Sequence, residues 1–268
     1  MLAFGAVAAR AQFVWSGAGN DGIVSNGLNW DGGVAPGGVS GTDDFLLDDS
    51  GNHSLNFTAP FAVRHIEVDG GLFDLTGVGP LTLNGNVTTA SGGSGYLFFS
   101  SPLILSAGQH NFTLGTVEVA GIDVAIFGQI SGTGGITKYG QGSLFIDHTD
   151  GNLFTGIIDL QEGRLVVHGN STLGTGLLKM NGGTLAAADY YDDNHTSILT
   201  NDVLLSGQSF FGDYYGKGSL TFTGTTTAAS GLVNSTAYVN AYGYGLLTFG
   251  DVTETSSETA FQFQGGGA

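Results

Sequence analysis

Short apolar bursts alternate with polar positions along most of this chain. Ile66-Glu67-Val68 and Leu81-Thr82-Leu83 are typical, since every second side chain is apolar. A period of two is typical of a strand that buries one face. Gly, Asn, Asp, Ser and Thr separate the bursts, and these residues form turns. No long stretch shows a clean helical period, so the pattern predicts an all-β protein built from many short strands.

A recurring motif, Gly-x-Gly-x-Leu-x-apolar, indicates internal repeats. Its copies begin at Gly77, Gly140, Gly174, Gly216 and Gly243. Two of the separations are near multiples of about 21 residues, a length that suits one coil of a β-solenoid. Sandwiches and barrels favour longer strands joined by hairpin turns such as Asn-Gly, and few such turns occur here. We therefore predict a parallel β-helix (β-solenoid) of about eleven coils over residues 44–268.

The composition agrees with this architecture. The sequence has 48 Gly among 268 residues, and charged residues make up 11%. Each coil turns several corners, where Gly adopts backbone conformations that a Cβ disfavours. Stacked coils place equivalent side chains about 4.8 Å apart, so like charges on neighbouring coils repel one another. Frequent Gly and few charges are both expected of such a stack.

The charge balance limits the possible partners. Only 6 Lys and Arg residues face 23 Asp and Glu residues, which gives a formal net charge of −17. A chain this acidic repels phosphate backbones, so no nucleic-acid partner is expected. The absence of Cys excludes disulfides, zinc–thiolate sites and thiol nucleophiles. No apolar run approaches the roughly 18 residues of a membrane-spanning helix, so no transmembrane segment is expected in this sequence.

The first eleven residues are similar to the end of a secretory signal peptide. A short apolar stretch leads to Ala9-Arg10-Ala11, which has the small residues of a cleavage site. The positively charged start of such a signal is absent. We interpret residues 1–11 as a partial signal peptide cleaved after Ala11, with an apolar N-terminal strand as the alternative.

Residues 130–187 carry the most regular pattern. Gly132 to Ile146 read Gly-Thr-Gly-Gly-Ile-Thr-Lys-Tyr-Gly-Gln-Gly-Ser-Leu-Phe-Ile, with a lysine at Lys138. The next segments are Asn-Leu-Phe-Thr-Gly at 152–156, Gly-Arg-Leu-Val-Val at 163–167, Leu-Gly-Thr-Gly at 173–176 and Asn-Gly-Gly-Thr-Leu at 181–185. This succession resembles the autotransporter-associated β-strand repeat of bacterial secreted proteins, with Ile136 where Leu is usual.

The resemblance implies a right-handed parallel β-helix, export and a surface role. It implies no catalytic residues, because the repeat itself is structural. The translocator barrel and sorting segment that accompany such repeats do not follow in this sequence. We therefore expect the chain to be a fragment of a larger secreted protein.

Residues 12–43 differ from the rest and contain both Trp residues, Trp15 and Trp30. Large aromatic residues near one end of a repetitive fold are expected to cap its open core. The same rings could instead offer a flat platform for a sugar. Trp15 and Trp30 are therefore candidate binding residues within a predicted N-terminal cap.

The segment 189–195 combines acids, aromatics and a histidine. Tyr190, Tyr191, Asp192 and Asp193 are its candidate binding residues. Glycoside hydrolysis needs two carboxylates about 5 to 9.5 Å apart, and neighbouring residues of a strand point to opposite faces. The acidic pair would therefore serve an enzyme only in a loop. The alternative is an exposed excursion between coils whose Tyr side chains pack on the rod.

Metal binding is only weakly indicated. The six His residues are scattered without a close pair, so no transition-metal site is expected. Asp147, Asp150 and Asn152 offer the oxygen ligands that calcium prefers, but their spacing fits no established calcium loop. Asp and Asn are also common turn residues. We expect no cofactor, with calcium as a weak possibility.

The sequence thus predicts a non-catalytic structural or adhesive stalk, secreted or displayed on a bacterial cell surface. Its expected partners are surface glycans or extracellular matrix. Two alternatives stay open, namely a β-helical carbohydrate-active enzyme (glycosidase or lyase) and a carbohydrate-binding module. Lyase action on acidic polysaccharides is disfavoured, because only six basic residues are present and none forms a cationic cluster.

Overall fold

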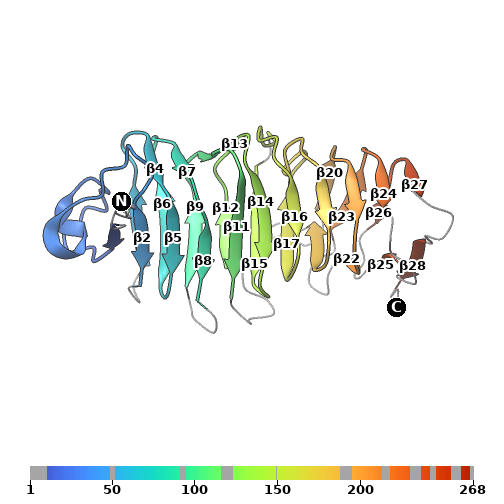
Figure 1. Cartoon of the computed structure of the whole chain (residues 1–268), viewed down its shortest axis with the longest axis horizontal. Helices are drawn as coiled ribbons and strands as arrows, with labels where there is room; N and C mark the ends of the chain where they lie inside the picture. Colours follow the sequence, from blue (N-terminus) through green and yellow to red (C-terminus); the bar gives the residue numbers. More distant parts are fainter. Residues whose placement is uncertain are drawn as a thin grey trace, which may run out of the picture.

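The chain winds into a rod of stacked coils, with the first described residues (blue) at one end of the rod and the last described residues (red) at the other (Figure 1). The computed structural model describes residues 11–48, 52–90, 95–115, 123–148, 150–187, 195–212, 218–229, 237–241, 246–254 and 261–265. Nearly all of the regular structure in these ranges is β-strand, and paired strands are parallel in every sheet. The predicted all-β parallel β-solenoid is confirmed. Of the expected signal peptide, residues 1–10 lie outside the described ranges.

Two long sheets run the length of the rod. Sheet A contains eleven strands, in the order β1 (Gln12–Val14), β2 (Asp44–Leu47), β5 (His65–Val68), β8 (Val87–Thr89), β11 (Gln109–Leu114), β14 (Gly135–Tyr139), β16 (Ile158–Leu160), β18 (Leu178–Met180), β21 (Val203–Leu205), β24 (Thr226–Ala228) and β27 (Val252–Glu254). Sheet B contains ten strands, in the order β3 (Asn52–Asn56), β6 (Leu72–Thr76), β9 (Tyr96–Phe99), β12 (Val124–Ile126), β15 (Ser143–Asp147), β17 (Arg164–His168), β19 (Thr184–Ala187), β22 (Ser209–Phe211), β25 (Ala237–Ala241) and β28 (Phe261–Gly265).

The third side of the rod is less regular. Its first small sheet contains β4 (Phe61–Val63), β7 (Leu81–Leu83), β10 (Leu103–Leu105) and β13 (Ile130–Gly132). Its second contains β20 (Thr196–Leu199), β23 (Ser219–Phe222) and β26 (Leu247–Thr248). Between the two small sheets, residues 150–157 and 169–177 cross the third side without forming a strand.

The coil count therefore differs slightly from the expected eleven. Within the described chain, the small sheets of four and three strands give seven coils with a strand on every side. The difference arises because the expectation assumed that all coils are alike. Two coils in the middle of the rod have loops in place of their third strand.

Coils of different length stack without interrupting the long sheets. Asp44 pairs with His65 one coil later, and Ile158 pairs with Leu178 after a slightly shorter coil. The coil from Thr226 to its partner Val252 is longer than either. Because these strands keep their register, the differences in length are accommodated outside the paired segments.

Inward-facing side chains form columns that continue from coil to coil. Val124, Leu144, Leu165 and Leu185 occupy equivalent positions in successive strands of sheet B. All four are fully or almost fully buried. Burying one such side chain contributes about 1.5–3 kcal/mol, so each coil is stabilised mainly by the coils on either side of it.

Part of sheet B is apolar on both faces. Phe145 lies between Leu144 and Ile146 and points to the opposite side, yet it is only 1% exposed. It forms a second apolar cluster with Ala125 and Val166. The outer face of these coils is therefore covered as well, which explains why all three middle residues of β15 are apolar.

Two buried Asn side chains support the coils that lack a third strand. Asn152 accepts a hydrogen bond from the Ile130 amide at 2.6 Å and donates to the Thr172 carbonyl at 2.7 Å. The Asn201 amide nitrogen donates to the Gly176 carbonyl at 2.7 Å. Each side chain links neighbouring coils as a strand ladder would, and so satisfies backbone groups that would otherwise be buried unpaired.

The N-terminal end of the rod is formed by residues 15–43, which contain the short 3-10 turns η1 (Gly27–Asn29) and η2 (Asp31–Gly33). Trp15 and Trp30 pair through an isolated antiparallel bridge. Their rings meet edge to face with centroids 5.0 Å apart, and Trp30 also contacts Phe45 at 4.8 Å. Phe45 belongs to β2, so the two indoles continue the apolar core into this end.

Candidate functional site

The two predicted Trp binding residues are buried. Trp15 and Trp30 are each 2% exposed. The Trp30 indole nitrogen donates to the Val24 carbonyl at 2.8 Å. A sugar stacks on an exposed ring face, and neither ring presents one. The platform interpretation is therefore wrong for these two residues in this conformation, and their contacts are those of core residues.

The other predicted binding residues lie outside the described residues. These are Tyr190, Tyr191, Asp192 and Asp193. The described chain stops at Ala187, the last residue of β19, and resumes at His195, just before β20. The interpretation of this segment as a binding or catalytic loop stays a prediction.

The three weak calcium candidates do not form a ligand set. Both amide atoms of Asn152 bond to the backbone, as described above. Asp147 pairs with His168, and Asp150 is exposed. Across the described ranges, no group of three or more His, Cys, Asp or Glu side chains is placed to hold a metal ion.

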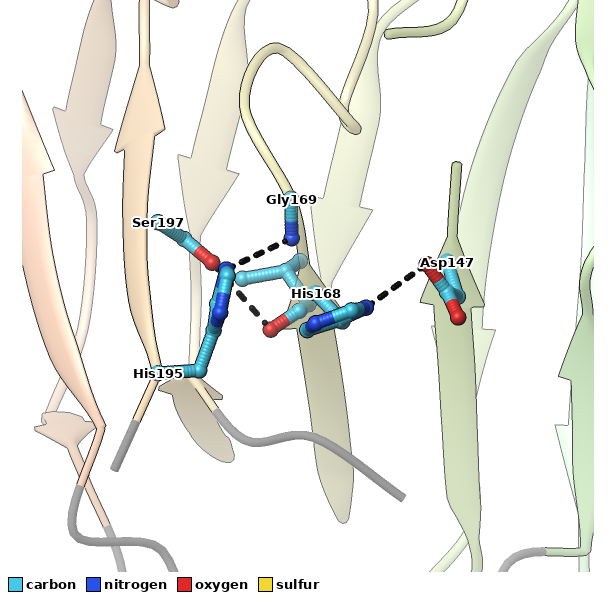
Figure 2. Close-up of polar contacts among 6 residues, drawn as sticks. Asp147, His168, Gly169, His195 and Ser197 are labelled. Atoms are coloured by element: carbon cyan, nitrogen blue, oxygen red, sulfur yellow. Dashed lines mark hydrogen bonds and ion pairs between the residues drawn. The ribbon is translucent and has the colours of Figure 1, made fainter. Parts of the chain in front are cut away.

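A cluster that the sequence reasoning missed lies at the C-terminal ends of β15 and β17 in the middle of sheet B, and Figure 2 shows it. Asp147 ends β15, and His168 ends β17 at the equivalent position one coil later. His168 Nδ1 lies 2.8 Å from Asp147 Oδ1. The rings of His168 and His195 are in contact, with centroids 4.1 Å apart and planes inclined at 58°. The parallel register thus brings together three titratable side chains that are far apart in sequence.

The hydrogen bonds define the state of His195. The Gly169 backbone amide donates to His195 Nε2 at 3.0 Å. A backbone amide can only donate, so Nε2 must carry a lone pair and the ring proton must lie on Nδ1. Nearby, the buried Ser197 hydroxyl donates to the Val167 carbonyl at 3.3 Å. The cluster therefore holds a neutral imidazole against the backbone of the preceding coil.

The cluster resembles only part of a catalytic site. Asp147 can orient the His168 ring, as a carboxylate does in an acid–base pair. The Ser197 hydroxyl bonds to a main-chain carbonyl rather than to either ring. Glycoside hydrolysis needs a second carboxylate, and within the described residues only Asp147 contributes one to this cluster. The geometry therefore supports proton exchange more directly than bond cleavage.

Lys138 is the second unusual ionisable group. It lies in the inward column of sheet A between Phe112 and Leu160 and is fully buried. Its Nζ donates to the carbonyls of Tyr139, Gly140 and Glu162 at 2.9, 2.7 and 3.2 Å. Burial lowers the pKa of Lys138 to about 8, although the nearby carboxylates of Asp123 and Glu162 act in the opposite direction.

These bonds give Lys138 a structural role. Its ammonium group fills a corner where three backbone oxygens converge, and it contacts both its own coil and the next. The amine is enclosed by the chain, so no substrate could reach it without a local opening. Lysine at this position of the repeat-like stretch is thus explained by packing and hydrogen bonding.

The Asp21 carboxylate orders the N-terminal end through hydrogen bonds. Asp21 accepts hydrogen bonds from the Ile23 amide and from the side chains of Asn29 and Asn26 at 2.9, 2.7 and 2.7 Å. These bonds hold the pKa of Asp21 below its ordinary value. A carboxylate stabilised by neighbouring donors is a common turn device, so Asp21 has a structural explanation.

No known protein-family model matches this chain, and no curated protein or solved structure matches it either. Within the described ranges, no helix is long and apolar enough to cross a membrane.

Proposed function

We propose that the chain is a structural and adhesive stalk of a secreted or cell-surface bacterial protein, without catalytic activity of its own. The observation that carries this proposal is the continuity of sheet A, in which eleven strands pair in one series from Gln12 to Glu254. Each added coil extends such a rod by about 4.8 Å. The architecture gives reach in proportion to the number of coils, which is what a stalk requires.

The roles of the ionisable groups also favour a scaffold. Lys138 and Asp21 make hydrogen bonds that order corners and turns. Buried Asn152 and Asn201 join coils. A rod held together in this way leaves its outer faces and loops for contact with surface glycans or matrix components, the partners proposed here.

A carbohydrate-active enzyme and a carbohydrate-binding module are the alternatives. The enzyme predicts reproducible turnover of a polysaccharide that is lost in Asp192→Ala or His168→Ala. The binding module predicts retention on a glycan array that is lost when Tyr190 or Tyr191 is changed to Ala. The stalk predicts neither loss, so assaying these variants beside the wild type on a polysaccharide panel and an array separates the three functions.

A direct test of the stalk removes one coil. Ile66 and Val87 are paired positions of neighbouring coils, so deletion of residues 66–86 removes one coil and preserves the register of sheet A. Displayed on bacteria, the shortened chain should keep the attachment of the wild type to glycan- or matrix-coated surfaces. Energy transfer between dyes at the two ends should report a rod shorter by about 4.8 Å. Loss of attachment with the rod intact would place the activity in the deleted coil and contradict a distributed stalk.

A further inference from the structure

The contact between His195 and Gly169 joins two successive coils through a titratable group. Gly169 follows β17 with φ +95° and begins the loop that crosses the third side without a strand. Its amide donates to His195 Nε2 at 3.0 Å. The same loop is joined to β20 by the Ser171 amide, which donates to the Ile198 carbonyl at 2.9 Å. His195 therefore helps to fasten this loop to the next coil.

Protonation of His195 is incompatible with this contact. The imidazolium ion has a donor on both ring nitrogens and no acceptor. Protonated Nε2 would direct its hydrogen at the Gly169 N–H, and the hydrogen bond would be replaced by repulsion. Histidine is the only side chain whose unperturbed charge change falls between about pH 5 and pH 8.

The neighbouring groups act in the same direction. Among the described residues of the adjoining strands, His168 of β17 faces the His195 ring, and Asp147 of β15 pairs with His168. Positive charges on both rings would stand about 4 Å apart and repel each other.

We propose that Asp147, His168 and His195 form a pH-sensitive latch. Near neutral pH, His195 is neutral and holds the corner at Gly169 closed against β20. In mild acid, His195 takes up a proton, the Gly169 contact breaks, and the corner at Gly169 loosens, while Asn201 still holds the rest of the loop through the Gly176 carbonyl and the long sheets stay paired. The proposal goes beyond the stalk function and does not depend on it.

Hydrogen exchange followed by mass spectrometry tests the latch on the whole chain. Exchange times at pH 7.5 and pH 5.0 are matched for the intrinsic chemical rate. Opening of the amides at Gly169–Ser171 should increase in acid by up to about tenfold per pH unit, the limit for coupling to one proton. The amides of β16 should keep the same protection at both pH values.

Two variants assign the effect to His195. His195→Gln keeps a side-chain acceptor but does not titrate, so its exchange at Gly169 should be independent of pH. His65→Gln is the matched control, because His65 lies on sheet A and contacts the Thr88 hydroxyl instead of a main-chain amide. It should keep the wild-type pH profile. The latch is refuted if His195→Gln retains the acid-induced opening, or if the wild type shows none.

A measurement on the unmodified protein covers the case in which His195→Gln does not fold. Nitrogen NMR of the histidine rings should show His195 Nε2 unprotonated at pH 7.5 and protonated when Gly169 opens. A proton on Nε2 at pH 7.5 would overturn the proposal independently of either variant.

Discussion

Lys138→Met is the most informative single change in the core. Methionine keeps an unbranched side chain in the column between Phe112 and Leu160 but removes the ammonium group. Two effects then compete. The carbonyl oxygens of Tyr139, Gly140 and Glu162 lose their shared donor, while the cost of burying a charge disappears.

The hydrogen bonds of Lys138 are expected to contribute more free energy than its buried charge costs, so lysine should be more stabilising than methionine. A hydrogen bond to a charged group contributes about 1.5–3 kcal/mol, so three of them contribute about 4.5–9 kcal/mol. The pKa of Lys138 falls from 10.5 to about 8, and at about 1.4 kcal/mol per unit the charged form is disfavoured by a net amount of about 3.5 kcal/mol, after the attraction of the nearby carboxylates. The difference predicts that Lys138→Met lowers the free energy of unfolding by about 1–6 kcal/mol near neutral pH.

The pH dependence gives an independent check with a definite sign. Between about pH 8 and pH 10.5, the unfolded chain binds a proton at Lys138 that the folded chain has released. The contribution of Lys138 to the free energy of unfolding therefore rises with pH across this window. It is lowest below pH 8. The advantage of the wild type over Lys138→Met should grow between pH 7 and pH 9.5.

Urea unfolding followed by circular dichroism measures both effects. Lys179→Met is the matched control, because Lys179 is also on sheet A but its ammonium lies 3.6 Å from Asp159 with the side chain 33% exposed. A partly exposed pair of this kind contributes less than about 1 kcal/mol. Equal or greater stability of Lys138→Met would refute the reasoning, since buried ions are sometimes replaced by apolar groups without loss.

Three further predictions concern the scaffold. Asn152→Leu removes both coil-to-coil bonds of this side chain and should cost about 2–4 kcal/mol in urea unfolding, whereas the exposed Asn84→Leu should cost far less. Gly156→Ala places a Cβ 2.1 Å from a backbone oxygen of the preceding coil and should cost about 3 kcal/mol or more. At Gly32, where φ is +81° and no atom lies within 4 Å, the same change should cost only about 1–2 kcal/mol, and comparable losses at both glycines would contradict this account. Trp30→Phe loses the indole hydrogen bond and should lower the thermal midpoint by an amount equivalent to about 1–3 kcal/mol, so an unchanged midpoint would argue against its packing role.

The sequence predicted the architecture because the β-solenoid depends on a local rule. Alternation at Ile66-Glu67-Val68 places the first and third side chains inward, and both are fully buried while Glu67 is exposed. The same rule places Lys138 on the same side of its strand as Ile136, so its burial could have been anticipated. The rule does not reveal which coils have a third strand, because the loops at 150–157 and 169–177 contain apolar residues too.

The candidate site was harder to predict because it depends on coil length. Asp147 and His168 are one coil apart and meet in register, but the step along the chain from His168 to His195 is longer. Coil length varies along the rod, so the sequence spacing alone does not show that His195 lies next to His168. The strand register is needed to place the two residues together. The burial of Trp15 and Trp30 was likewise undetermined, because an aromatic residue near a rod end can cover the core or face solvent with the same local pattern.

The direction of the hydrogen bonds between coils has a mechanical consequence. In sheet A these bonds run along the rod, so tension applied at the ends pulls each coil away from its neighbour. A pulled rod would release coils one at a time, beginning at an end. A coil of about 21 residues occupies about 4.8 Å of the folded rod and extends to about 70 Å once released. Lys138, Asn152 and Asn201 each tie one coil to the next near the middle, so extension should pause there. Such a molecule would lengthen under force by unfolding single coils, before the attachments at its two ends break.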